Sequence, residues 1–255
     1  MVPLSAVLVT HNEEQRLPAA LESLRFCDEV VVVDDGSTDR TREVAERAGA
    51  RVVVNSPWPG FAAQRNRALD EARHDWVLTI DADERVTPAL RVQIEGVRAG
   101  GFTHAGYRIP RVAFYLGRWI RGTDWYPDWQ LRLFDRRRGR WGAALIHESA
   151  QVDGPVGRLR GELEHFPYSD IASHVGRMNG YTALWAREAY DAGHRTSALE
   201  MALVPRFAFV RNYLLKGGIR LGWAGYTVSR LNAYYTFLKL AKLAELQRAR
   251  ETSGA

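Results

Sequence analysis

A run of four valines between Glu29 and Asp34 is the feature of the sequence that most restricts the fold. An uninterrupted β-branched run of this kind is typical of a parallel strand that is buried on both faces. Other apolar runs predict strands at residues 5–10, 51–55 and 76–81, and helices are predicted at about 13–25, 39–48 and 61–72. Because strands and helices alternate, we expect an α/β fold with a mostly parallel sheet and helices on both faces.

The regular alternation stops after about residue 100. Strands are predicted at 107–111 and 130–134, and the pattern is helical from about Ser169 onward. Pro205 and the pair Gly217-Gly218 are expected to interrupt these helices. We therefore expect an α/β domain over residues 1–168, with halves at 1–100 and 101–168, and a helical extension over residues 169–255.

Positive charge is concentrated in the C-terminal part of the chain. No Asp or Glu lies between Glu200 and Glu245, whereas seven Lys and Arg residues lie there among many Trp, Tyr, Phe and Leu residues. Since the whole chain carries a formal charge of +5 and this segment +7, the remainder carries −2. Such a composition is typical of a segment that lies on an anionic membrane surface. The alternative is a helical pair packed on the core. A membrane span is not expected, because Arg220 and Arg230 interrupt the apolar stretches.

Two further features favour a cytoplasmic protein. The single cysteine, Cys27, allows no internal disulfide and suits a reducing compartment. Residues 1–10 lack the basic leader and cleavage site of a signal peptide, and they are predicted to enter the first strand. Together with the basic C-terminal segment, this predicts a peripheral location on the inner face of the cytoplasmic membrane.

Three of the predicted strands end in polar clusters. These clusters are Thr10-His11-Asn12-Glu13, Asp34-Asp35-Gly36-Ser37-Thr38-Asp39 and Asp81-Ala82-Asp83-Glu84. Because the carboxyl ends of parallel strands meet at one edge of a sheet, we expect all three clusters to converge on one crevice.

Two of these clusters indicate particular chemistry. Asp81 and Asp83 are electrostatically costly at the end of a buried strand unless a cation lies between them, and carboxylate oxygens suit Mg²⁺ or Mn²⁺. A capped turn alone explains Gly36 and Ser37 but not a second aspartate, which could accept hydrogen bonds from a base or a ribose. The glycine-rich loops of dinucleotide-binding and P-loop proteins are missing from the sequence, so those two classes are not favoured.

Taken together, these motifs resemble the family 2 glycosyltransferases of the GT-A fold. The matches are the first two clusters, then Gln64-Arg65-Asn66, then Asp81-Ala82-Asp83 of the third cluster, in this order and spacing. The resemblance implies a metal site at Asp83. His165 is a candidate for a further metal ligand or a diphosphate contact, and the alternative is a purely structural histidine. It also implies Glu148, after His147, as the catalytic base. The nucleotide-binding residues that it implies are Thr10, Asn12, Glu13, Asp35, Gln64, Arg65, Asn66, Asp81 and Ala82.

The second half of the chain looks like the branch that includes lipopolysaccharide-core β-glucosyltransferases. The matching residues are Pro127 to Phe134, Trp141, His147-Glu148, Glu164-His165 and Tyr168. Asp128, Arg132 and His147 are candidates for binding the acceptor or the diphosphate. Arg132 could equally be a salt-bridge partner in a core-facing strand, and His147 could simply pack.

This resemblance implies a complete activity. The enzyme would be an inverting transferase that moves a hexose from UDP-glucose or a similar nucleotide sugar to a glycolipid or lipopolysaccharide-core acceptor. Residues 1–100 would form the nucleotide-binding half of the catalytic domain and residues 101–168 its acceptor half. Mg²⁺ or Mn²⁺ would be the cofactor, an anionic membrane surface a partner, and no nucleic acid is expected.

Two alternatives remain open on the sequence. A polyprenyl-phosphate glycosyltransferase has an acceptor that is already ionised, so it would not need Glu148 as a base. A membrane-tethered nucleotide-binding module would bind UDP without turnover of any UDP-sugar. An aspartyl-phosphate phosphatase is disfavoured, because its Asp-x-Asp motif would follow the first strand.

Overall fold

The computed structural model describes residues 1–142 and 149–253, and its contacts divide the chain into two compact units. The first unit contains Met1–Val112 and Asp128–His165, and the second contains Ala113–Pro127 and Phe166–Ala255. The predicted domain boundary at residue 168 stays a prediction, since a division by contacts is not a test of independent folding.

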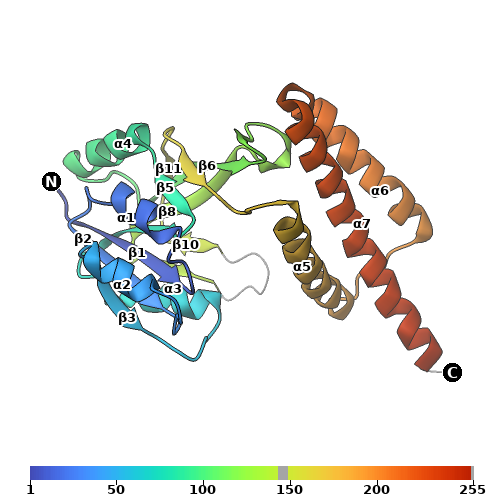
Figure 1. Ribbon diagram of the computed structural model, residues 1–255, viewed down its shortest axis with the longest axis horizontal. Helices are drawn as coiled ribbons and strands as arrows, with labels where there is room; N and C mark the ends of the chain where they lie inside the picture. The colour runs from blue at the N-terminus through green and yellow to red at the C-terminus, as the bar shows by residue number, and fades with distance from the viewer. Residues whose placement is uncertain (143–148, 254–255) are drawn as a thin grey trace. The chain divides into compact units, whose positions relative to one another are not determined.

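Most of the regular elements belong to the first unit (Figure 1). In chain order they are β1 (Leu4–Thr10), α1 (Leu17–Ser23), β2 (Glu29–Asp34), α2 (Thr41–Arg47), β3 (Arg51–Val54), α3 (Phe61–Glu71), β4 (Trp76–Asp81), β5 (Glu84–Val86), α4 (Pro88–Ala99), β6 (Gly106–Tyr115), β8 (Asp128–Asp135), β9 (Gly139–Trp141), β10 (Ala150–Val152), β11 (Val156–Arg158) and β12 (Leu163–His165). The last residues of β6 extend into the second unit.

The main sheet has the order β3-β2-β1-β4-β8-β6-β12-β5, and β9 pairs with β10 in a separate small sheet. The strands β1, β2, β3 and β4 are parallel, because a helix connects each of them to the next and returns the chain to the same end of the sheet. Beyond β4 the pairs β4–β8, β8–β6 and β12–β5 are antiparallel. The expected α/β fold is confirmed, and its sheet is mixed.

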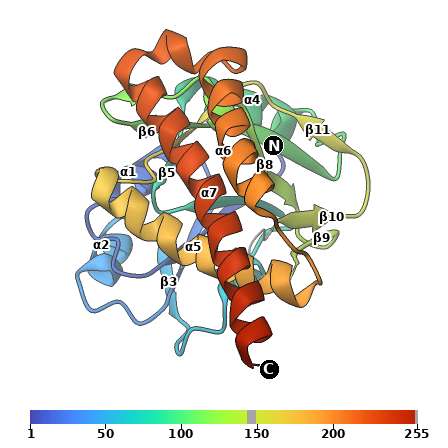
Figure 2. The same cartoon turned by 90° about the vertical axis from the view of Figure 1, so that its right-hand side faces the viewer.

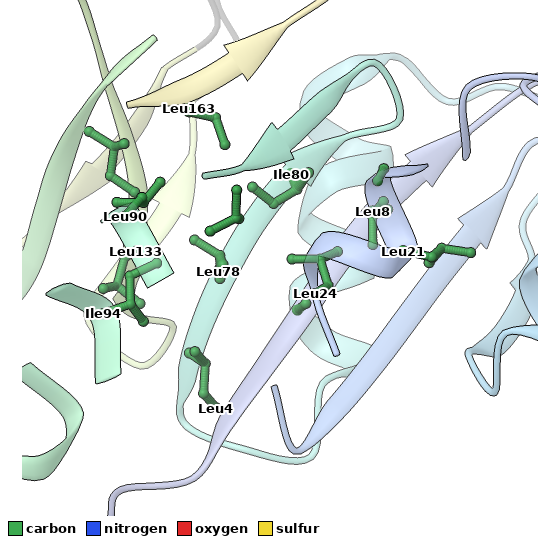
Figure 3. Close-up of a cluster of buried hydrophobic side chains, with 14 of the residues drawn as sticks. Leu4, Leu8, Leu21, Leu24, Leu78, Ile80, Leu90, Ile94, Leu133 and Leu163 are labelled. Carbon is green, nitrogen blue, oxygen red and sulfur yellow. The ribbon is translucent and has the colours of Figure 1, made fainter. Parts of the chain in front are cut away.

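Apolar side chains cover both faces of the parallel strands. On β1, Leu4 and Leu8 join one buried cluster, whereas Val7 joins another, because successive side chains of a strand point to opposite faces. Leu21 of α1 and Leu90 and Ile94 of α4 lie in the first cluster (Figure 3). Leu69 of α3 lies in the second. The valine run of β2 is divided between the two clusters in the same way, as expected for a strand buried on both sides.

The second unit is mainly helical (Figures 1 and 2). Its elements are β7 (Arg118–Trp119), a 3₁₀ turn (Thr123–Trp125), α5 (Ile171–Asp191), α6 (Ala198–Val210), a π-helical turn (Arg211–Leu215), a second 3₁₀ turn (Gly218–Leu221) and α7 (Gly222–Ser253). Capping boxes at Asp170 and Ser197 begin α5 and α6. Both α5 and α6 pack against α7. Among the described helices, none is both long enough and apolar enough to cross a bilayer.

The predicted helix interruption at Pro205 is wrong. Pro205 lies inside α6, which continues to Val210. An interior proline removes a backbone hydrogen bond and crowds the preceding turn of the helix, and the packing of α6 along α7 offsets this cost. The interruption at Gly217-Gly218 is confirmed, because Gly217 has a left-handed φ of 73° and a new 3₁₀ turn begins at Gly218.

Candidate active site

The strand register brings the three polar clusters to one edge of the sheet. Thr10 at the end of β1 is aligned with Asp34 of β2, and Val9 is aligned with Asp81 of β4. The loops that follow β1, β2 and β4 therefore leave the sheet at the same level. Their predicted convergence has its basis in this alignment.

Hydrogen bonds fasten the loop after β1 to the loop after β2. The Thr10 hydroxyl donates to Asp34 Oδ1 at 3.2 Å, and the Asn12 backbone N–H donates to Ser37 Oγ at 2.9 Å. The Asn12 side-chain oxygen accepts from the Thr38 backbone N–H at 2.9 Å. Thr10 and Asn12 are thus engaged with the protein itself, and they shape the loops of the candidate nucleotide site.

The adjacent aspartates Asp34 and Asp35 have different environments. Asp34 is fully buried, and its carboxylate accepts from the backbone N–H of Ser37 at 2.8 Å. The carboxylate of Asp35 lies 3.7 Å from His11 Nδ1, and 14% of its side chain is exposed. Glu13, on the neighbouring loop, has 25% of its side chain exposed and lies 3.5 Å from Arg16. Asp34 therefore holds the turn, whereas the Asp35 carboxylate is accessible to a ligand.

Helix α3 carries three of the predicted nucleotide-binding residues, and each contacts other protein groups. The amide of Gln64 is buried and exchanges hydrogen bonds with Asn55 at 2.5 and 3.1 Å. Asn66 exchanges hydrogen bonds with the backbone of Trp141 at 2.9 and 3.0 Å. Arg65 lies over the Trp141 ring at 4.3 Å and forms an ion pair with Asp81 at 2.8 Å. These contacts join α3 to β4, to β9 and to the residue that follows β3.

Asp81 belongs to a chain of alternating charges. Its Oδ2 lies 2.5 Å from Arg132 Nη2, and the same nitrogen lies 2.6 Å from Glu84 Oε1. Glu84 also pairs with Arg111 at 2.9 Å, and Arg111 pairs with Asp128 at 2.6 Å. Burial alone would raise the pKa of Asp81, but the nearby arginines, Arg132 first among them, hold the pKa well below its usual range.

This network changes the explanation of the Asp81-Ala82-Asp83 motif. A divalent cation was expected to compensate both carboxylates, but guanidinium groups already compensate Asp81. Arg132 is 2% exposed, and of the two roles considered for it the salt bridge is the one that the structure displays. Burial lowers the pKa of Arg132, but the charges of Asp81 and Glu84 outweigh this and raise the pKa above its usual value.

Asp83 has a different partner, because β5 pairs with β12. The antiparallel register aligns His165 with Glu84, next to Asp83 in sequence, and His165 Nε2 lies 3.4 Å from Asp83 Oδ2. Ala82 is buried between the two aspartates. Burial would raise the pKa of Asp83, but the contact with His165 more than offsets it, and the pKa lies below its usual value.

The donor atoms of Asp83 and His165 suit a divalent metal ion that takes its other ligands from a substrate. Within the described residues no group of three or more His, Cys, Asp or Glu side chains could hold a metal ion. One carboxylate and one imidazole are compatible with Mg²⁺ or Mn²⁺, since these ions usually keep several waters and bind substrate phosphates. The metal role of both residues stays a prediction.

Sequence reasoning gave no role to Glu84 or Arg111, two members of this network. Glu84 is fully buried and accepts hydrogen bonds from Arg111, Arg132 and the backbone N–H of Asp81. The signal that could have indicated the network is an arginine within the otherwise apolar run of β8, because a buried arginine almost always has an acidic partner. His147 and Glu148 lie outside the described residues.

Comparison with known proteins identifies the chain as a glycosyltransferase. It belongs to the family described as glycosyl transferase family 2, whose model matches residues 5–152. A lipopolysaccharide core biosynthesis glycosyltransferase, LpsC of Rhizobium meliloti, is 33% identical over 95% of this chain and 92% of its own length. An uncharacterized glycosyltransferase of Rickettsia typhi is 30% identical over 96% of this chain and 88% of its own length.

Solved structures are also similar to this chain. Glucosyl-3-phosphoglycerate synthase of Mycobacterium tuberculosis, in complex with Mn²⁺, UDP and glucosyl-3-phosphoglycerate, is 29% identical, with a TM-score of 0.37 over 46% of this chain and 45% of that chain. A TarS structure (residues 1–349) from S. aureus has 14% identity and a TM-score of 0.48 over 99% of this chain and 92% of that chain.

Proposed function

We propose that this glycosyltransferase moves a hexose from a UDP-sugar to a glycolipid of the lipopolysaccharide-core type, with inversion at the anomeric carbon. The assignment of a nucleotide-sugar donor rests on the contact between Asp83 and His165. This pair lies at the same edge of the sheet as Asp35. The name of the Rhizobium relative, similar over nearly the whole of both chains, supports the acceptor half.

On the nucleoside side, we assign Asp35 and Glu13 to hydrogen bonds with the base and the ribose. Asp35 suits this role, because Asp34, and not Asp35, accepts the hydrogen bond from the Ser37 backbone that stabilises the turn. Thr10, Asn12, Gln64 and Asn66 have protein partners, so we assign them to shaping the site rather than to direct contact. Arg65 lies next to Asp81 at the same edge and adds positive charge close to the expected diphosphate.

On the diphosphate side, Asp83 and His165 would hold Mg²⁺ or Mn²⁺. When bound, the ion supplies positive charge to the departing diphosphate. Asp83 suits this better than Asp81, because guanidinium groups surround Asp81 whereas Asp83 faces the imidazole of His165. The arginine network fixes the Asp81 side of the motif and leaves the Asp83 carboxylate for the ligand.

The transfer step requires a base on the acceptor. We assign this role to Glu148, which would take the proton from the acceptor hydroxyl while that oxygen bonds to the anomeric carbon. The bond from that carbon to the diphosphate oxygen breaks on the opposite side, and UDP leaves with the bonding electron pair. Asp128 and His147 remain candidates for the acceptor side, and Asp128 is tied to Arg111.

A glycolipid acceptor places the enzyme at a membrane. We propose a peripheral position on the inner face of the cytoplasmic membrane, with the basic residues between Glu200 and Glu245 supporting contact with anionic lipids.

Two variants test this proposal. Asp83→Asn should lower Mn²⁺-dependent UDP binding in calorimetry and reduce transfer from a screened set of nucleotide sugars by about 100-fold or more. Glu148→Gln should leave UDP binding intact and reduce transfer by about 100-fold or more, because only the proton acceptor is lost.

The two results separate the alternatives. Unchanged metal-dependent UDP binding in Asp83→Asn would contradict the metal assignment. Full transfer activity in Glu148→Gln would contradict the base assignment and favour an acceptor that is already ionised, such as a polyprenyl phosphate.

A further inference from the structure

Exposed apolar side chains of the second unit form stripes on two neighbouring helices. Among the exposed apolar residues are Leu199, Leu203, Phe207 and Val210 on α6 and Trp223, Tyr226, Tyr234 and Phe237 on α7. Spacings of three, four and eight residues place each set on one face of its helix. The helices α6 and α7 pack side by side (Figure 2). Exposed apolar side chains grouped in this way are typical of an interaction surface.

A groove joins the two stripes. It has a volume of about 340 Å³ and is lined by residues of both helices, among them Arg206, Phe209, Val210, Arg230, Tyr234 and Phe237. This volume lies at the lower end of the range of small-molecule sites, ~300–1,000 Å³. The guanidinium of Arg230 lies 5.4 Å from the centre of the Phe209 ring. This positively charged group therefore lies beside an aromatic side chain that lines the groove.

The basic residues of α6 and α7 and of the turn between them differ in their partners. Arg211 and Lys216 both pair with Asp124. Arg206 and Arg230, in contrast, are exposed and form no ion pair within the part of the chain that the structure describes. No acidic residue occurs from 201 to 244, so over this range α6 and α7 contribute only positive charge.

We propose that this α6–α7 face lies on an anionic phospholipid bilayer, with the phosphate of one acidic phospholipid bound between Arg206 and Arg230 and its acyl chain along the groove. The inference rests on the proposed membrane location and specifies the surface that makes the contact. Trp223, Tyr226 and Tyr234 suit it, because aromatic rings with a polar edge are enriched at the boundary between headgroups and acyl chains.

Charge favours a bilayer over a second copy of the chain. A twofold interface through this face would place the same patch of each copy against the other, and the uncompensated arginines would face each other. An anionic lipid surface supplies the opposite charge along the whole face.

Vesicle flotation of the full-length protein tests the proposal. Vesicles of phosphatidylcholine and phosphatidylglycerol should bind the protein in a salt-sensitive manner, and vesicles of phosphatidylcholine alone should bind it weakly. The double variant Arg206→Gln/Arg230→Gln should reduce binding to the anionic vesicles by about tenfold or more. The charge-matched control Arg25→Gln/Arg47→Gln removes two cations that pair with Glu22 and Glu43 in the first unit, and it should change binding by less than about twofold.

A second variant and a second measurement keep the test decisive. Phe207→Ser/Phe237→Ser should also reduce binding, while its thermal unfolding and Mn²⁺-dependent UDP binding stay at the wild-type level. Equal losses in the groove and control variants would overturn the proposal, as would a wild-type dimer in sedimentation that Phe207→Ser/Phe237→Ser dissociates. If UDP binds but vesicles do not, this inference fails and the proposed donor chemistry stands. If vesicles bind but UDP does not, the proposed function fails instead.

Discussion

Two carboxylates that are separated by one residue have different chemical environments in this protein. Asp81 faces Arg65 and Arg132, and Asp83 faces His165. The difference arises because Arg132 belongs to β8, whereas His165 belongs to β12. The sequence predicted acidic residues at this edge correctly, but the source of the compensating charge depends on distant strands and could not be predicted from local pattern.

At the residue scale, Glu84→Gln is expected to destabilise the protein strongly. Glu84 is fully buried and pairs with the half-buried Arg111 and the buried Arg132, so the substitution leaves these two guanidinium groups with too little negative charge. Breaking a buried pair in this way costs about 3–5 kcal/mol. The free energy of unfolding in urea measures this loss. The control is Glu95→Gln, which breaks an exposed pair with Arg91 and should cost about 1 kcal/mol or less. Equal losses in the two variants would contradict the importance of the network.

At the element scale, local pattern predicted the parallel strands well. The bounds of β2 and β4 agree with the predicted 29–34 and 76–81, because a continuous apolar run ends where the first charged or polar cluster begins. The short strands β5, β9, β10, β11 and β12 were not predicted. Each has only three residues, and a strand of that length depends on its pairing partner more than on its own composition. His165 reaches Asp83 only because of one such pairing.

The close approach between the start of α7 and the preceding 3₁₀ turn gives a prediction at the same scale. A Cβ at Gly225 would collide with the Gly218 carbonyl oxygen and lie 2.7 Å from Leu221 Cβ. Gly225→Ala should therefore lower the free energy of unfolding by about 1–3 kcal/mol, as overpacking typically does. Gly180→Ala in α5 is the matched control: nothing lies within 4 Å of its Cβ, and the protein should become more stable by about 0.5–1 kcal/mol. Thermal and urea unfolding of both variants would reveal the opposite signs, and a neutral Gly225→Ala would contradict the close contact.

At the scale of the whole molecule, the segment Ala113–Pro127 groups with the C-terminal helices rather than with the sheet that precedes it in the chain. Tyr115 is buried, and its hydroxyl lies 3.1 Å from His174 Nδ1 of α5. Trp125 donates to Asn232 of α7 at 3.1 Å, and the backbone N–H of Asp124 donates to Asn212 at 2.7 Å. These contacts join residues that are between 59 and 107 positions apart in the sequence.

A chain that ends at residue 168 tests whether the predicted boundary or the contact-based division describes the folding units. The truncation removes His174, Asn212 and Asn232, so we expect Tyr115 and Trp125 to become exposed. The fragment should bind a hydrophobic dye and unfold with reduced cooperativity, and the full-length chain measured in parallel should do neither. A monomeric fragment with cooperative unfolding and wild-type UDP binding would support the boundary at 168.

Local pattern is sufficient to predict the α/β class, the positions of the parallel strands and the acidic clusters at their ends, because these follow from periodicity and from the rule that parallel strands end at a common edge. Tertiary structure alone decided that arginines neutralise Asp81, that His165 lies beside Asp83 and that Arg206 and Arg230 share one groove. Each of these contacts joins separate elements whose spacing depends on strand register and helix packing, and side-chain charges interact over a few ångströms of space rather than over sequence distance.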